Sequence, residues 1–155
     1  MKRSKFITGG MVLSAVSLAD PAFAASVQSL PLDQPQTIDN IRLACTGVGS
    51  REQHNPDWKK YAVKLETVGG YGQYLADENI SLRGKNGTVL IRAACDAPWL
   101  VMQLDPGRYS ATVEVAGAAS KHVSFTAPAR GQRDVIVRFP SKLAGREMNR
   151  SQSHV

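Results

Sequence analysis

The stretch Leu104-Asp105-Pro106-Gly107-Arg108-Tyr109-Ser110-Ala111-Thr112-Val113-Glu114-Val115 decides the fold class. Its Asp-Pro-Gly segment predicts a tight turn, because proline fixes φ near the value that such turns need and glycine accepts positive φ. From Tyr109 onward, every second residue is apolar and the residues between them are polar. A period of two is typical of a half-buried strand, so one face of this segment should pack on a core and the other should meet solvent.

Segments of the same kind occur along most of the chain. Alternation recurs at 61–67, 80–83, 122–126 and 134–139. Asn86-Gly87 stands between two such runs and predicts a β-hairpin, because both residues tolerate positive φ. We count about seven strands, beginning with the segment 38–44, and no long helical period. This pattern predicts an all-β fold, a single antiparallel seven-stranded Greek-key sandwich.

One segment lacks the strand pattern. Residues 51–60 show no alternation, so we expect either a short helix or an irregular loop there.

The N-terminus has the form of a Sec-type signal peptide. Residues 1–5 carry three basic side chains, the 13 residues from Phe6 to Leu18 are uncharged, and Ala22-Phe23-Ala24 fits a cleavage site. The uncharged run is shorter than the roughly 20 residues that span a bilayer. We therefore expect cleavage after Ala24, a periplasmic or secreted protein, and no membrane span after cleavage. The expected parts of the chain are a signal peptide (1–24), a linker (25–35), a β-sandwich domain (36–140) and a flexible basic tail (141–155).

The charge of the chain argues against a nucleic-acid partner. The 155 residues carry a formal charge of +6, which falls to +4 once the three basic and one acidic residues of the predicted signal peptide are removed. The basic residues are spread singly, whereas nucleic-acid binders concentrate them on one face or segment. Weak attraction to anionic envelope polymers is compatible with this net charge.

The chain has two cysteines, Cys45 and Cys95. In an oxidising compartment an isolated even pair predicts one disulfide. A thiol redox site needs a Cys-x-x-Cys spacing and a metal site needs neighbouring histidines, and neither pattern occurs. We expect a Cys45–Cys95 disulfide, no cofactor and no metal.

Several segments, taken in their order along the chain, resemble small exported carboxypeptidase regulatory-like domain proteins of proteobacteria. Residues 104–113 resemble the L-x-P-G-x-Y-x-V-x-V signature of that family. The other matching elements are Gly47-Val48-Gly49, Tyr74-Leu75-Ala76-Asp77, the hairpin 84–89 and Pro98-Trp99-Leu100-Val101. The resemblance covers residues 45–139, and implies a transthyretin-like sandwich without peptidase activity of its own.

The residues offer little for catalysis. His54 lies in a polar loop, His122 at a strand edge and His154 in the tail, so none is placed to serve as a general base. Asp77 and Glu78 are adjacent and should point to opposite faces of a strand, which separates them as a catalytic pair. We expect no enzyme; a hydrolase is the alternative that peptide and ester substrates would reveal.

Three aromatic residues are candidates for contact with a ligand or partner. The segment 69–74 is rich in glycine but lacks the Lys-Ser/Thr of a phosphate loop, so it predicts no nucleotide site. Tyr71 and Tyr74 could instead contact a sugar or a partner protein, although Tyr74 is also read as a packing residue. Trp99 is expected to pack on the disulfide and cap the core, with partner contact as the alternative.

These observations predict a non-catalytic accessory or interaction module of the bacterial envelope. Its partner would be an envelope protein, or a second copy bound through the sheet edges. The alternative is a carbohydrate- or surface-binding module in which the tyrosines bind cell-wall glycan.

Overall fold

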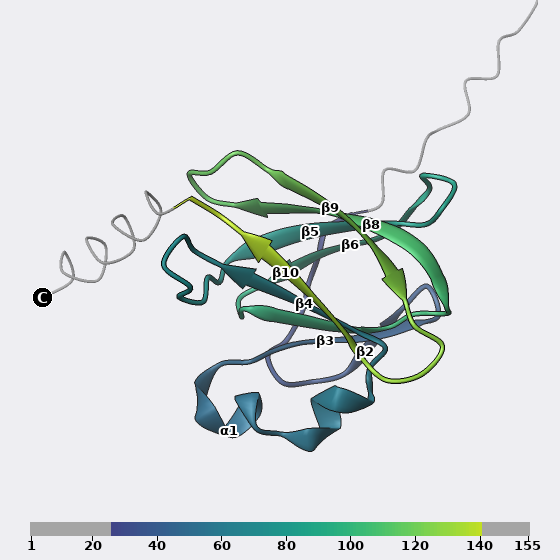
Figure 1. The fold of residues 1–155 in the computed structure, drawn as a ribbon, viewed down its shortest axis with the longest axis horizontal. Coiled ribbons are helices and arrows are strands. Elements are labelled where there is room, and N and C mark those ends of the chain that lie inside the picture. The colour runs from purple at the N-terminus through teal and green to yellow at the C-terminus, as the bar shows by residue number, and fades with distance from the viewer. Residues whose placement is uncertain (1–25, 141–155) are drawn as a thin grey trace, which may run out of the picture.

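The computed structural model describes residues 26–140, and within them most of the regular secondary structure is β-strand (Figure 1). The predicted signal peptide (1–24) and basic tail (141–155) lie outside the described residues. The strands are β1 (Gln28–Ser29), β2 (Gln36–Ile38), β3 (Ile41–Thr46), β4 (Val63–Val68), β5 (Glu78–Arg83), β6 (Val89–Cys95), β7 (Trp99–Gln103), β8 (Gly107–Val115), β9 (Lys121–Ala127) and β10 (Arg133–Arg138). The helical elements are α1 (Gly49–Gln53) and the 3-10 helix η1 (Pro56–Lys60).

The strands form two five-stranded sheets. Sheet A has the order β1-β6-β5-β8-β9 and sheet B the order β10-β4-β7-β3-β2. Inward side chains of both sheets meet in one core, in which Leu65 and Leu100 of sheet B join Leu82 and Val113 of sheet A. The all-β class is thus confirmed, and the two sheets bury their apolar faces against each other.

The predicted arrangement of seven antiparallel strands is wrong. Both sheets are mixed, because β1 pairs with β6 in parallel and β10 pairs with β4 in parallel. The β10 register runs from Arg133 opposite Val63 to Arg138 opposite Val68. Alternation within a strand reports which face is buried but not which strand lies beside it, so the parallel pairings had no sequence signal.

Part of the difference in strand number comes from a missed hairpin. The segment 38–44, predicted as one strand, contains the turn that separates β2 from β3. Asp39 and Asn40 both have positive φ, and Ile38 lies opposite Ile41. A two-residue loop with both φ values positive is the type I′ geometry that joins twisted strands.

The segment predicted as a linker (25–35) belongs to the sandwich from residue 26 onward. It carries β1, and Leu30 is buried in the core. Asp33 then crosses to sheet B, where its backbone N–H donates to the Cys45 carbonyl and its carboxylate accepts from the Thr46 hydroxyl. The segment thus contacts both sheets.

Two predicted turns are present. The Asn86-Gly87 turn joins β5 to β6, but only Gly87 has positive φ, and the Gly87 N–H donates to the Gly84 carbonyl. At the start of β8, the Tyr109 hydroxyl donates to the Asp105 carbonyl over 3.0 Å, which ties the strand to the turn before it.

The segment without strand pattern forms α1 and η1, which Figure 1 shows below β2 and β3. Trp58 and Tyr61 are buried there against Ala44 and Val101, which point out of sheet B on the side away from the main core. A second, smaller core therefore covers part of the outer face of sheet B. Neither helix, nor any other within residues 26–140, is long and apolar enough to cross a membrane.

Candidate functional site

Strand β10 forms one edge of sheet B. Val135 and Val137 are buried in the core, whereas Asp134, Ile136 and Arg138 are exposed on the outer face of sheet B. Ile136 is 55% exposed in the middle of a regular strand. The row thus presents an apolar side chain between an acidic and a basic one.

The backbone of β10 is also available on one side. The N–H groups of Arg133 and Phe139 donate to carbonyls of β4 and the segment before it. Since alternate residues direct their backbone groups to the same side, the N–H and C=O groups of Asp134, Ile136 and Arg138 point away from β4. Among the described strands, none pairs with β10 on that side.

The other sheet edges are less suited to accept a strand. β1 has two residues and β2 has three, and very short edge strands offer little to pair with. β9 is longer, but its exposed row is the polar set His122, Ser124 and Thr126, and the strand starts with Lys121, a residue that disfavours edge pairing. Within residues 26–140, β10 is the edge that combines length with an exposed apolar residue.

The three aromatic residues predicted to contact a ligand or partner differ in how exposed they are. Tyr71 is 82% exposed at the tip of its loop, whereas Tyr74 is 43% exposed and meets Trp99 edge-on with ring centroids 6.1 Å apart. Trp99 is only 6% exposed, so it offers no open ring face for stacking.

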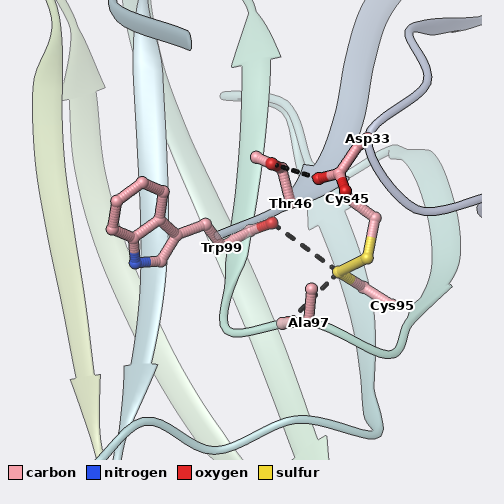
Figure 2. Close-up of a disulfide and its surroundings, with 6 residues drawn as sticks. All are labelled: Asp33, Cys45, Thr46, Cys95, Ala97 and Trp99. Atoms are coloured by element: carbon pink, nitrogen blue, oxygen red, sulfur yellow. Dashed lines mark hydrogen bonds between the residues drawn. A yellow bond between two sulfur atoms is a disulfide. The ribbon is translucent and has the colours of Figure 1, made fainter. Parts of the chain in front are cut away.

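The expectation that Trp99 packs on the disulfide is wrong. Figure 2 shows its ring directed away from Cys45 and Cys95, and only its backbone carbonyl lies near Cys95 Sγ, at 3.7 Å. A disulfide sulfur has no proton to donate, so this is a close contact. The inward residue of this strand is Leu100, and alternation therefore sends the Trp99 ring to the outer face of sheet B. There the Lys64 ammonium lies 4.4 Å from its centroid.

Gly47 makes this position of Trp99 possible. Its φ is +97°, and a Cβ on it would lie 2.6 Å from Trp99 Cδ2. We expect Gly47→Ala to lower the free energy of unfolding by about 2 to 4 kcal/mol, since it adds a steric clash to the strain of a positive φ. Gly49→Ala is the matched control, because Gly49 has φ +81° with nothing within 4 Å of the added Cβ. Equal losses in urea denaturation would show that the contact with Trp99 does not matter.

The predicted disulfide is confirmed. Cys45 on β3 and Cys95 on β6 are bonded, and both are fully buried. Because these strands belong to different sheets, the bond joins sheet A to sheet B inside the core (Figure 2).

Glu78 is a buried acid whose burial the sequence analysis missed. It is 1% exposed on the inner face of β5, beside Cys95 on the neighbouring strand. Burial raises the pKa of its carboxyl to about 8, and the Thr67 hydroxyl across the core offsets only part of this rise. The geometry falls short of a hydrogen bond, since the Thr67 hydroxyl and both Glu78 oxygens lack partners in the described chain. The signal was present, because Glu78 shares the alternation of Ile80 and Leu82, which are both inward.

A cleft of about 460 Å³ lies over the smaller core, lined in part by Arg42, Glu52, Trp58 and Tyr61. The Trp58 indole N–H donates to Glu52 over 3.0 Å. Hydrogen bonds from Asn55 and Trp58 lower the pKa of the Glu52 carboxyl. The Arg42 guanidinium lies 5.6 Å from the centre of the Tyr61 ring. These contacts fix α1 and η1 on sheet B, so we assign this cluster to the fold.

The histidines within the described residues form no catalytic set. His54 Nδ1 contacts the Ser50 carbonyl, and His122 Nδ1 lies 3.2 Å from the Thr112 hydroxyl on the exposed face of sheet A. Along residues 26–140, no hydrogen bond joins either imidazole to a carboxylate that could orient it. No three His, Cys, Asp or Glu side chains of the same segment come together to hold a metal ion. His154 lies outside the described residues.

No protein-family model matches this chain, and no curated protein is significantly similar to it in sequence.

Proposed function

We propose that the protein is a non-catalytic β-sandwich module of the bacterial envelope, which binds a partner protein by accepting a strand at the open edge of β10. The observation that supports this proposal is the row Asp134, Ile136 and Arg138 on an edge strand of six residues. Strand addition supplies affinity through main-chain hydrogen bonds and specificity through alternate side chains. The row on β10 offers both.

The compartment is part of the proposal. A buried disulfide between the two sheets fits a protein that folds in an oxidising environment. The predicted Sec-type signal peptide, with cleavage after Ala24, would deliver it to the periplasm or outside the cell. The ordered motifs of residues 45–139 support membership of the transthyretin-like, carboxypeptidase regulatory-like Greek-key sandwiches.

Site-specific photo-crosslinking in the cell tests the proposal. A photoreactive residue at Ile136 of the full chain should yield a crosslinked band of defined mass, which mass spectrometry then identifies. Thr126 is the matched control, because it is exposed on the other long edge strand, β9. Equal labelling from both positions, or none from Ile136, would contradict strand addition at β10.

The second candidate function is glycan or surface binding by the tyrosine loop, favoured by the 82% exposure of Tyr71. If it holds, Tyr71→Ala should abolish retention on peptidoglycan or polysaccharide while the melting temperature stays within about 1 °C of wild type, because exposed substitutions change stability little. Tyr74→Ala should also reduce retention, with a small loss of stability because Tyr74 packs edge-on against Trp99. Unchanged retention of both variants would exclude this function.

A further inference from the structure

We infer that the strand accepted by β10 is β10 of a second copy of this chain, paired antiparallel about a two-fold axis at Ile136. This inference rests on the proposed function and names its partner. The argument uses the direction of the free backbone groups, the order of charges along the strand and the exposure of Ile136.

The free backbone groups select which residues can face each other. Those of Asp134, Ile136 and Arg138 point away from β4, so a hydrogen-bonded pair across the new edge must join two residues of this set. In an antiparallel pair, two such opposed residues exchange both N–H···O=C bonds. Pairing Ile136 with its own copy places Asp134 opposite Arg138 of the second chain, and Arg138 opposite Asp134. About six backbone hydrogen bonds would then form across the edge.

The side chains are complementary in this register. Asp134 and Arg138 are equidistant from Ile136, so each carboxylate faces a guanidinium of the other copy on the same face of the sheet. The Asp134 carboxylate also lies 3.5 Å from the Lys64 ammonium on β4 and keeps an exposed side toward the second copy. Opposed side chains in an antiparallel pair lie about 4.5 to 5.5 Å apart at Cβ, close enough for ion pairs and apolar contact. The exposed Ile136 side chains cover each other at the centre.

Other registers lose these contacts. A shift that places Ile136 opposite Asp134 or Arg138 puts an apolar side chain against a charged one. A shift by one residue would place Ile136 opposite Val135 or Val137 of the second copy. The backbone groups of those residues point toward β4, so the hydrogen bonds across the edge could not form. The two-fold register at Ile136 is therefore the one that forms the backbone hydrogen bonds, pairs Asp134 with Arg138 and brings the two Ile136 side chains into contact.

The size of the contact sets the expected strength. One pair of six-residue strands is smaller than the roughly 1,200 Å² at which standard stable interfaces begin. We therefore expect reversible dimers with a dissociation constant in the micromolar range or weaker, about 10 to 100 μM, as for other small interfaces.

Charge reversal on the mature protein tests the inference. In sedimentation velocity between about 5 and 500 μM, the wild type should shift from monomer to dimer over the range set by that affinity. Asp134→Arg sets two arginines opposite each other at both ends of the pair, and should weaken dimerisation about tenfold or more. The double variant Asp134→Arg/Arg138→Asp restores complementarity and should recover the dimer. Melting temperatures of all variants establish that each is folded.

Single cysteines test the register directly. Ile136→Cys places the new thiols opposite each other in the proposed dimer, within the Cα separation of about 5.5 Å that disulfides accept. Oxidation should therefore give a covalent dimer. Asp134→Cys is the matched control, since its thiol would face Arg138 of the second copy and stay unlinked.

The outcomes separate the two proposals. A wild type that stays monomeric at 500 μM, or a charge-swapped double variant that fails to dimerise, would overturn the second copy as the partner. If the photoreactive residue at Ile136 still captures a different protein, strand addition at β10 would stand. Loss of both the dimer and the crosslink would overturn both.

Discussion

Replacing Cys45 and Cys95 together with alanine is expected to lower the free energy of unfolding by about 4 kcal/mol. The disulfide closes a loop with a sequence separation of 50 residues, and the cross-link removes conformational entropy from the unfolded chain. It also joins the two sheets, so the reduced protein would retain only the core contacts between them. Urea denaturation at neutral pH measures the loss, and we expect a steeper slope than for wild type, because the unfolded chain without the cross-link exposes more surface.

The serine pair is the informative companion to the alanine pair. Both cysteines are 0% exposed, so two buried hydroxyls would add a desolvation cost of about 1 to 3 kcal/mol each where they find no partner. We therefore expect the serine double variant to be less stable than the alanine double variant. Two free thiols in the purified protein, or stability unchanged by reductant, would contradict the prediction.

Local patterns predicted local structure well. The alternation in β8 predicted its buried face, and the turns at Asp105-Pro106-Gly107 and Asn86-Gly87 lie where proline, asparagine and glycine placed them. The Asp39-Asn40 turn carried the same kind of signal, two residues that tolerate positive φ between apolar neighbours, but it lay inside a segment read as one strand. Its recognition would have separated β2 from β3.

Long-range pairing could not be predicted from these patterns. The parallel neighbours β4 and β10 are joined by about 65 residues of chain, and nothing in either strand specifies the other. The same limit explains the linker prediction at 25–35, because two prolines and scattered polar residues concealed that Leu30 reaches the core.

At the candidate site, too, the local pattern could be predicted from the sequence and the strand order could not. Alternation within β10 could have identified Ile136 as an outward apolar residue, since Val135 and Val137 read as inward. That β10 forms an edge was knowable only from the sheet order. The orientation of Trp99 was misjudged because proximity to Cys95 in sequence was used where the alternation with Leu100 decides the face.

Glu78→Gln is expected to stabilise the protein near neutral pH and to flatten its stability across the acidic range. In the folded protein the pKa of Glu78 is about 8, against 4.5 as the ordinary value. The unfolded chain therefore releases this proton above pH 4.5, whereas the folded chain holds it until about pH 8. Between these values the folded state binds more protons, so stability due to this group is complete below pH 4.5 and falls by about 1.4 kcal/mol per pH unit as pH rises. Above pH 8 the fall ends.

Glutamine is close in shape to the protonated acid and does not ionise, so the variant loses this dependence. At pH 7 we expect Glu78→Gln to exceed wild type by about 3 kcal/mol, and at pH 4.5 to match it within about 1 kcal/mol. Urea denaturation from pH 4.5 to pH 8.5 measures both. Glu114→Gln is the matched control, because it makes the same change at an exposed position of β8. Parallel profiles for wild type and Glu78→Gln would mean that Glu78 is ionised in the folded core, in which case an unseen partner must compensate its charge.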